Sequence, residues 1–168
     1  FERLAGGTGF DFDRPLAKPE RLNNLELGST YTSPTFTAGA NLFWMDFRDE
    51  IVKNGQLDLF GQPVTGNAER TVHRGIELTS AVRPVDRLTL QGNLSLSRNT
   101  FEDHTVFEGD TAVELEGNRI AGFPDVLANA RVTYETAGLR ASLSLQYVGK
   151  QFTDNTEDNR KAPEARSD

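Results

Sequence analysis

The residues best suited to catalysis are few, and none of them stands in a catalytic motif. The chain has two histidines, His73 and His104, and no cysteine. It contains neither a Gly-x-Ser-x-Gly nucleophile elbow nor a phosphate-binding loop that ends in Gly-Lys-Ser or Gly-Lys-Thr. A hydrolase triad would have to use one of these two histidines. The sequence therefore favours a protein that is not an enzyme.

Oxygen-rich side chains, which can bind calcium, gather in two runs. Glu102 and Asp103 stand immediately before His104. The second run consists of Asp154, Asn155, Glu157, Asp158 and Asn159. Neither run has the spacing of an EF-hand loop, and a solvated loop explains both of them. We therefore expect no metal site and no bound cofactor in this chain.

The segments that carry these residues alternate between apolar and polar side chains. In LTLQGNLSLS, residues 88–97, the leucines share one parity and the polar residues share the other. Successive side chains of a β-strand point to opposite faces, so such a strand has one apolar and one polar face. The same pattern recurs over residues 25–31, 36–44, 76–82, 126–134 and 139–147. The sequence predicts an all-β protein of about six antiparallel strands.

The expected connections between these strands alternate in length. Short turns fall at Ser33-Pro34, at Pro84 to Asp86 and at Thr136 to Gly138. Long stretches with no convincing structure of their own, 53–67 and 101–124, separate the other strands. Loops of that length are uncommon in compact soluble domains. Short turns at one rim and long loops at the other are typical of outer-membrane barrels.

The polar parity distinguishes a membrane barrel from a soluble sandwich. In a sandwich the leucines form the core, whereas in a barrel they face lipid and the polar side chains line a wet interior. The polar parity here carries side chains that need water or polar partners, namely Glu26, Asn41, Glu77, Gln91, Arg131, Arg140 and Gln146. We therefore predict an antiparallel transmembrane β-barrel segment.

Composition narrows the class of partner. The chain has 168 residues, 36% of them hydrophobic, and a net charge of −7 with no basic stripe. Nucleic acid is therefore not an expected partner. No apolar run approaches the roughly 20 residues that a transmembrane helix needs. The sequence has neither an initiator methionine nor a clear terminating element, and we expect a segment of a longer protein.

Several phrases of the sequence are distinctive in their order and spacing. They are KPE at 18–20, NNLELGSTY at 23–31, NLFWMDFRDEIV at 41–52, NAERTVHRGIELT at 67–79, GNRIAGFPDVLANARVTY at 117–134 and LQYVGKQFTDN at 145–155. Together they extend over nearly the whole chain. They resemble the corresponding segments of TonB-dependent outer-membrane receptors, and most of all those of the siderophore-receptor branch.

That resemblance implies a barrel of about 22 strands around an N-terminal plug, in the outer membrane of a Gram-negative bacterium. It implies import of a ferric siderophore or a similar scarce nutrient, driven by the inner-membrane TonB complex. Residues 1–168 would be about six strands from the C-terminal half of the barrel domain, with the plug and the terminal strands absent. The implied partners are the ligand, TonB through the absent plug, the lipid bilayer and lipopolysaccharide.

The barrel topology also implies the side of the membrane on which each connection lies. The turns at Ser33, Pro84 and Ala137 would be periplasmic. The extracellular segments would be residues 1–22, 53–67, 101–124 and 152–168.

Charged residues are the candidates for a ligand path. Glu77, Arg131 and Arg140 share the polar parity, where they would contact ligand or plug or form salt bridges within the wall. Arg119, near the base of a long loop, would meet an anionic siderophore. The alternative interpretation of the chain is a self-contained β-sheet binding protein, either a small barrel adhesin or a sandwich lectin.

Overall fold

The protein is an all-β structure in the computed structural model, which describes residues 17–57, 60, 63–108 and 111–157. No helix among these residues is long and apolar enough to cross a membrane. The strands are β1 (Arg21–Thr32), β2 (Phe36–Leu57), β3 (Pro63–Val85), β4 (Leu88–Asp103), β5 (Thr105–Glu108), β6 (Thr111–Glu114), β7 (Val126–Thr136) and β8 (Leu139–Val148).

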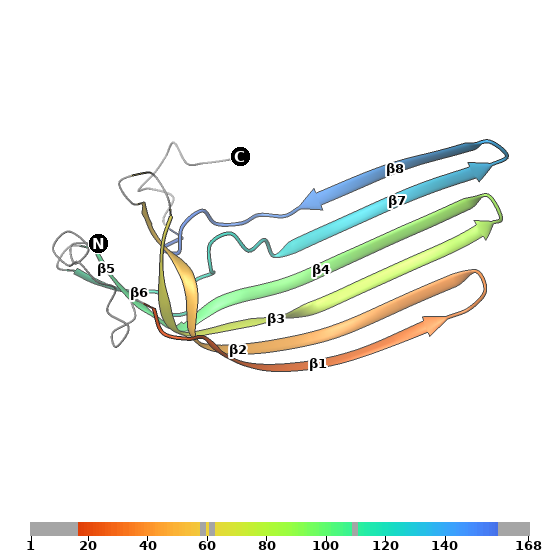
Figure 1. Ribbon diagram of the computed structural model, residues 1–168. Coiled ribbons are helices and arrows are strands. Elements are labelled where there is room, and N and C mark those ends of the chain that lie inside the picture. Colours follow the sequence, from red (N-terminus) through yellow and green to blue (C-terminus); the bar gives the residue numbers. More distant parts are fainter. Residues whose placement is uncertain (1–16, 58–59, 61–62, 109–110, 158–168) are drawn as a thin grey trace, which may run out of the picture.

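One six-stranded antiparallel sheet, in the order β1-β2-β3-β4-β7-β8, forms most of the structure. The strands lie side by side in Figure 1, and the antiparallel strands predicted from the alternating pattern are confirmed. β1 and β8 form opposite edges and do not pair with each other, so the sheet is open. β5 and β6 form a separate hairpin at the end of the sheet away from the short turns (Figure 1).

The register brings the apolar parities of neighbouring strands to one face. One row across the sheet consists of Leu27, Leu42, Ile76, Leu96 and Val126, each opposite the next. The adjacent row, on the other face, consists of Gly28, Asn41, Glu77 and Ser95. A slip of one residue in any strand would exchange its two faces. The sheet as a whole therefore has one apolar and one polar face.

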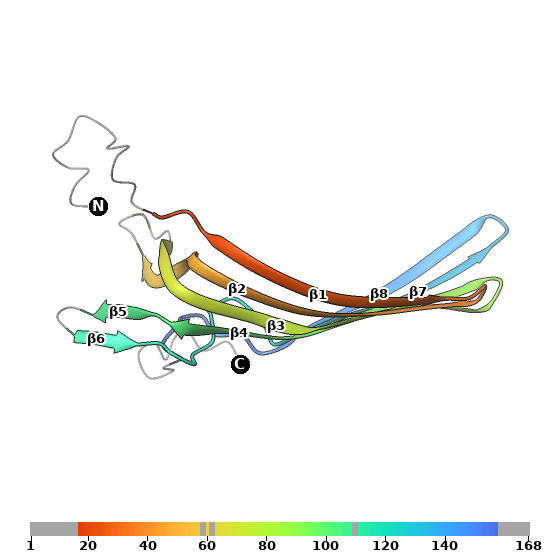
Figure 2. The ribbon, with the colours of Figure 1, turned by 90° about the horizontal axis from the view of Figure 1, so that it is seen from below.

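The apolar face is uncovered. Leu27 is 72% exposed, Leu143 75% and Leu145 69%. Figure 2 shows the sheet from the side as a single curved layer, and no second sheet packs on this face among the described residues. A continuous band of leucines is unfavourable in water, so this face needs an apolar partner. A two-layer sandwich would bury these leucines. The sandwich in the alternative interpretation of the sequence was therefore wrong.

The short turns lie where the sequence predicts them. They join β1 to β2, β3 to β4 and β7 to β8 at one end of the sheet (Figure 1). Gly138, in the last of these turns, has a φ of 79°. Residues with a Cβ rarely adopt this left-handed conformation, so glycine suits a tight hairpin at this position.

The prediction that residues 53–67 and 101–124 lack structure of their own was wrong. β2 and β3 continue to pair through Lys53 and Thr65 as far as Leu57 and Pro63. β4 extends to Asp103 before the β5–β6 hairpin begins. The sequence of these extensions does not alternate regularly between apolar and polar residues. The alternation that marks a strand in the sequence is therefore missing from them.

A small hydrophobic core lies at this loop end of the sheet. Its buried side chains are Val52, Ala68, Phe101, Leu115 and Ile120, with Val106 and Val113 packed against them. The chain after β6 returns to β4 through backbone hydrogen bonds. The N–H of Phe101 donates to the carbonyl of Asn118 at 3.0 Å, and the N–H of Leu115 donates to that of His104 at 2.9 Å. The connection between β6 and β7 is thus folded against the strands.

The oxygen-rich runs were expected to be solvated. Glu102 and Asp103 are exposed as expected, but the expectation was wrong for His104, which follows them, and for Asn155. His104 and Asn155 are both buried. Nδ1 of His104 lies 2.7 Å from a carboxylate oxygen of Glu69. The amide of Asn155 donates to the carbonyl of Lys53 and accepts from the N–H of Ala121. Since buried polar groups need partners, these bonds fix the segment after β8 against two other segments. The rest of that run, Asp158 and Asn159, lies outside the described residues.

Replacing Phe101 by alanine should loosen the loop end. Phe101 has no exposed surface, and truncation of a core phenylalanine costs about 3–5 kcal/mol. We expect hydrogen exchange of the Leu115 amide, which bonds to the His104 carbonyl, to accelerate at least about 100-fold. Phe101→Leu keeps most of the volume and is the matched control, with an expected change below about tenfold. Unchanged exchange in Phe101→Ala would contradict this account of the core.

Candidate functional site

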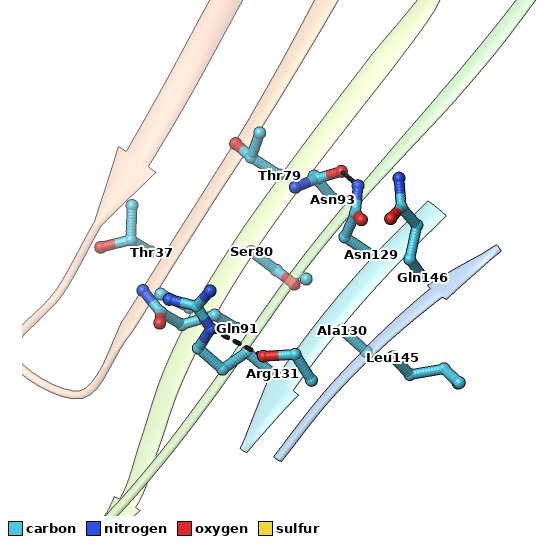
Figure 3. A pocket seen from close by; sticks show the side chains of 13 residues that line it. Thr37, Thr79, Ser80, Gln91, Asn93, Asn129, Ala130, Arg131, Leu145 and Gln146 are labelled. Atoms are coloured by element: carbon cyan, nitrogen blue, oxygen red, sulfur yellow. Dashed lines mark hydrogen bonds between the residues drawn. The ribbon is translucent and has the colours of Figure 1, made fainter. Parts of the chain in front are cut away.

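The polar face of the sheet is hollowed. The hollow has a volume of about 770 Å³. Figure 3 shows Gln91, Asn93, Asn129 and Arg131 extending from β4 and β7 into it. The polar side chains that line it are Thr37, Thr79, Gln91, Asn93, Asn129, Arg131, Ser144 and Gln146. Their amide, hydroxyl and guanidinium groups can bind water or a polar ligand through hydrogen bonds.

Hydrogen bonds between opposite residues of neighbouring strands orient the side chains of this hollow. Nδ2 of Asn129 donates to Oδ1 of Asn93 at 2.9 Å, and Nε of Arg131 donates to Oγ of Ser144 at 3.1 Å (Figure 3). No other hydrogen bond or ion pair of the Arg131 side chain is present within the described ranges. The outer nitrogens of this guanidinium are therefore available to a ligand.

The register places Glu77, Arg131 and Arg140 on the polar face. Glu77 is exposed on β3, and its carboxylate has no partner in the part of the chain that the structure describes. Arg140 forms an ion pair at 3.1 Å with Glu135 beside the β7–β8 turn. Glu77 and Arg131 thus carry unpaired charges on the polar face among the described residues, whereas the charge of Arg140 is paired with that of Glu135.

Arg119 is not brought together with these residues. It lies in the connection between β6 and β7, where its backbone forms a bridge with Thr100. Its guanidinium pairs with the carboxylate of Asp125 and lies 5.8 Å from the ring centre of Phe152. A guanidinium with a carboxylate partner attracts a further anion less strongly. In this arrangement Arg119 holds the loop against the segment after β8.

A buried polar network lies at the loop end of the sheet. Nδ1 of His73 is 2.9 Å from Oδ1 of Asn99, and Nε2 is 3.0 Å from a carboxylate oxygen of Glu50. The hydroxyl of Thr71 donates to the same carboxylate. Both ring nitrogens of His73 are therefore occupied, and neither contacts a hydroxyl nucleophile among the described residues. The network is suited to holding strands together rather than to catalysis.

The sequence singled out only His73 of this network, and Glu50, Thr71 and Asn99 were not predicted; Glu50 is the member whose parity is misleading. By parity it belongs with Trp44 on the apolar face, yet its carboxylate meets Thr71 and His73, which have the polar parity. Asp49, immediately before it, has a φ of 57°. A left-handed residue within a strand interrupts the alternation of side chains. No feature of the sequence marks this interruption, so the position of Glu50 emerges only from the structure.

Aromatic rings cover the network, and metal ligands do not gather around it. The rings of Phe47 and Phe123 pack edge-on against His73, each with centroids 5.2 Å apart. No group of three His, Asp or Glu side chains is arranged to hold a metal ion within the described ranges. The chemistry that the arrangement supports is binding by hydrogen bonds and charge along the polar face.

Comparison with known proteins identifies the family that shares this architecture. The family model described as TonB dependent receptor-like, beta-barrel, matches residues 2–166. The chain belongs to the TonB-dependent receptor β-barrel family. Membership confirms the resemblance seen in the sequence and accounts for a sheet without helices. No curated protein sequence matches the chain.

Solved receptor structures share this fold. The ferric yersiniabactin uptake receptor FyuA from Yersinia pestis is 22% identical, with a TM-score of 0.60 over 81% of this chain and 20% of that one. The ferric-catecholate import receptor Fiu from K12 E. coli is 17% identical, with a TM-score of 0.59 over 86% of this chain and 19% of that one. The copper transporter OprC is 18% identical, with a TM-score of 0.59 over 78% and 19%. The chain therefore spans about one fifth of the length of these proteins.

Removing the Glu50 carboxylate should destabilise the loop end of this TonB-dependent receptor barrel. Thr71 and His73 are buried and would each lose a partner, at a cost of about 1–3 kcal/mol per group. Hydrogen exchange along the β2–β3 hairpin would measure the loss in Glu50→Ala. Glu114→Ala removes an exposed carboxylate and is the control, with an expected change within about 0.5 kcal/mol. Equal effects of the two substitutions would show that the network adds no stability.

Proposed function

We propose that this chain is part of the barrel wall of an outer-membrane TonB-dependent receptor that imports a ferric siderophore or a similar scarce nutrient. The observation that carries the proposal is the two-faced sheet, with exposed leucines on one face and a polar hollow on the other. Lipid supplies the apolar surroundings that the leucines need, and a wet interior suits the polar face. Energy for import would reach a plug inside the barrel through the TonB complex.

The open edges of the sheet support a larger barrel. Among the described strands, β1 and β8 each pair on one side only. Unpaired backbone groups within a bilayer cost several kcal/mol each, so both edges need further strands. A barrel of about 22 strands would close the sheet on itself. In this proposal residues 1–168 are a partial barrel domain, and the plug and terminal strands belong to other parts of the receptor.

Aromatic residues support an orientation for the wall. Trp44 and Tyr147 stand on the apolar parity toward the loop end, and Tyr31, Phe36 and Tyr134 stand on it toward the short turns. Barrels carry such girdles at both membrane interfaces. The loop end would be extracellular and the short turns periplasmic. Of the proposed extracellular segments, residues 1–16 and 158–168 lie outside the described part of the chain.

Within this wall, Glu77 and Arg131 are the residues that we propose for contact with ligand or plug. Both are exposed on the polar face, and the outer nitrogens of Arg131 are free of partners among the described residues. Arg140 and Arg119 already have carboxylate partners. We therefore propose that these two arginines stabilise the wall and the loop.

The class of ligand rests on the siderophore-receptor resemblance of the sequence phrases. Two of the similar solved structures are named for ferric chelates, and one is named for copper. Since these proteins share the fold at low identity, they support transport more strongly than they support a particular cargo. A ferric siderophore is the proposed ligand, and copper is the alternative that the uptake experiment must distinguish.

Arginine substitutions on the two faces test the orientation of the sheet. Leu94 lies on the apolar face of β4 between Leu78 and Ala128. Leu94→Arg should destabilise the receptor in lipid vesicles by about 2–4 kcal/mol, measured by urea unfolding. The neighbouring Asn93 faces the hollow, and Asn93→Arg should cost less than about 1 kcal/mol. Equal costs at the two positions would contradict the assignment of faces.

Uptake by living cells tests the transport function. Deleting the receptor gene should abolish uptake of radioactive iron supplied as one member of a panel of catecholate, hydroxamate and carboxylate siderophores. A plasmid copy should restore uptake, and deletion of TonB should cause the same loss. Uptake that continues without TonB would contradict the mechanism. Loss of copper uptake, with every iron chelate still imported, would overturn the proposed ligand.

A further inference from the structure

Arginines gather on the apolar parity immediately beyond the band of leucines, on the side of the loop end. In one row Arg74 pairs with Arg98 and lies opposite Trp44. The arginine cluster, as we call this group, consists of Arg21, Arg48, Arg70, Arg74 and Arg98. The chain has a net charge of −7, and these residues are far apart in the sequence. The register of four neighbouring strands brings them to one face in two rows, and the row between them contains Asp46, Val72 and Thr100.

The pairing within the cluster is unfavourable in the absence of an anion. Arg48 stands directly opposite Arg21 on one side and opposite Arg70 on the other. Arg74 stands directly opposite Arg98. Like charges at directly opposite positions destabilise a sheet. A phosphate between such residues replaces repulsion by attraction, because the fork of N–H donors on a guanidinium matches phosphate oxygens.

The protein neutralises only part of this charge itself. Nε and Nη2 of Arg70 lie 2.9 and 3.1 Å from the two carboxylate oxygens of Asp46. These hydrogen bonds lower the pKa of the Asp46 carboxyl, which lies on the loop side of the leucine band, outside the proposed membrane-spanning part. The carboxylate of Asp46 also attracts Arg48. The other members of the cluster are exposed, and no hydrogen bond or ion pair joins their side chains to a carboxylate within the described ranges.

We propose that the arginine cluster binds the phosphate groups of lipopolysaccharide. The row next to the cluster includes Leu27, Leu42, Ile76 and Leu96. An amphiphile lying on this face would place its acyl chains on the leucines and its phosphates among the guanidinium groups. Trp44 stands beside Arg74 at the level that interfacial aromatic residues occupy. This inference rests on the proposed outer-membrane location, in which the loop end faces the outer leaflet.

Binding of phosphorylated and dephosphorylated lipid A to the purified receptor tests this proposal. Replacing Arg74 and Arg98 by glutamine should weaken binding of phosphorylated lipid A about 10- to 30-fold. Binding of the dephosphorylated lipid should be unchanged. The matched control replaces Arg83 and Arg87, which are exposed at the short-turn end, and should change the affinity less than about twofold. Equal affinities of wild type and cluster variant, or an equal loss in the control, would overturn the proposal.

Thermal unfolding separates lipid binding from folding. In detergent without lipid, Arg74→Gln should leave Tm unchanged or raise it, because a like-charge pair is removed. With phosphorylated lipid A, the wild type should gain more in Tm than the variant. A variant that gains as much as the wild type would overturn the proposal.

Outer-membrane fractionation and iron-chelate uptake distinguish this inference from the transport function. Wild-type receptor that fractionates with the outer membrane and binds phosphorylated lipid A, yet imports no chelate, would overturn the proposed transport alone. Normal uptake with equal lipid A affinity in wild type and cluster variant would overturn the lipid site alone.

Discussion

Alternation of side chains with a period of two, kept in step across the sheet, is the constraint on which the rest of the structure depends. Between β2 and β3, and between β3 and β4, the central rows pair without a slip from Thr71 to Val82. A slip would put leucines into the hollow and amides onto the apolar face. With the register kept, lipid on one face and a wet interior on the other, as in the proposed barrel wall, would satisfy both faces without a core between two layers.

The loop end obeys a different rule, since the alternation stops there. The left-handed backbone at Asp49 turns Glu50 toward His73, and a register shift follows at Arg70 and Thr71. These irregularities coincide with the small core around Phe101 and with the buried polar network. Strands without a core of their own thus continue into a region that is stabilised by its own packing. The small core and the polar network hold the loops against the ends of the strands.

The sequence was sufficient to predict the strands whose faces differ in polarity, and it failed where they do not. The segment LTLQGNLSLS predicted β4 because apolar and polar residues alternate in it. The outer parts of β2 and β3 were taken for loops because their sequence does not alternate in this way. Asn155 was expected in solvent, yet its burial depends on partners at Lys53 and Ala121, which are distant in the sequence. Parity correctly placed Glu77 and Arg131 on the polar face, whereas the ion pair of Arg119 with Asp125, within the β6–β7 connection, does not follow from parity.

Charge shows the same dependence on register. Along the sequence, the arginines of the cluster are separated by apolar and acidic residues, and the net charge of −7 conceals them. Pairing of β1 to β4 places them in two rows of one face, on either side of the row of Asp46, Val72 and Thr100, and Arg48 lies between Arg21 and Arg70. Folding alone gives no reason to align like charges in this way, just as it gives no reason to expose the leucines beside them. Both features become favourable when the partner is an amphiphile with apolar chains and an anionic head, which is the partner that we propose for this face.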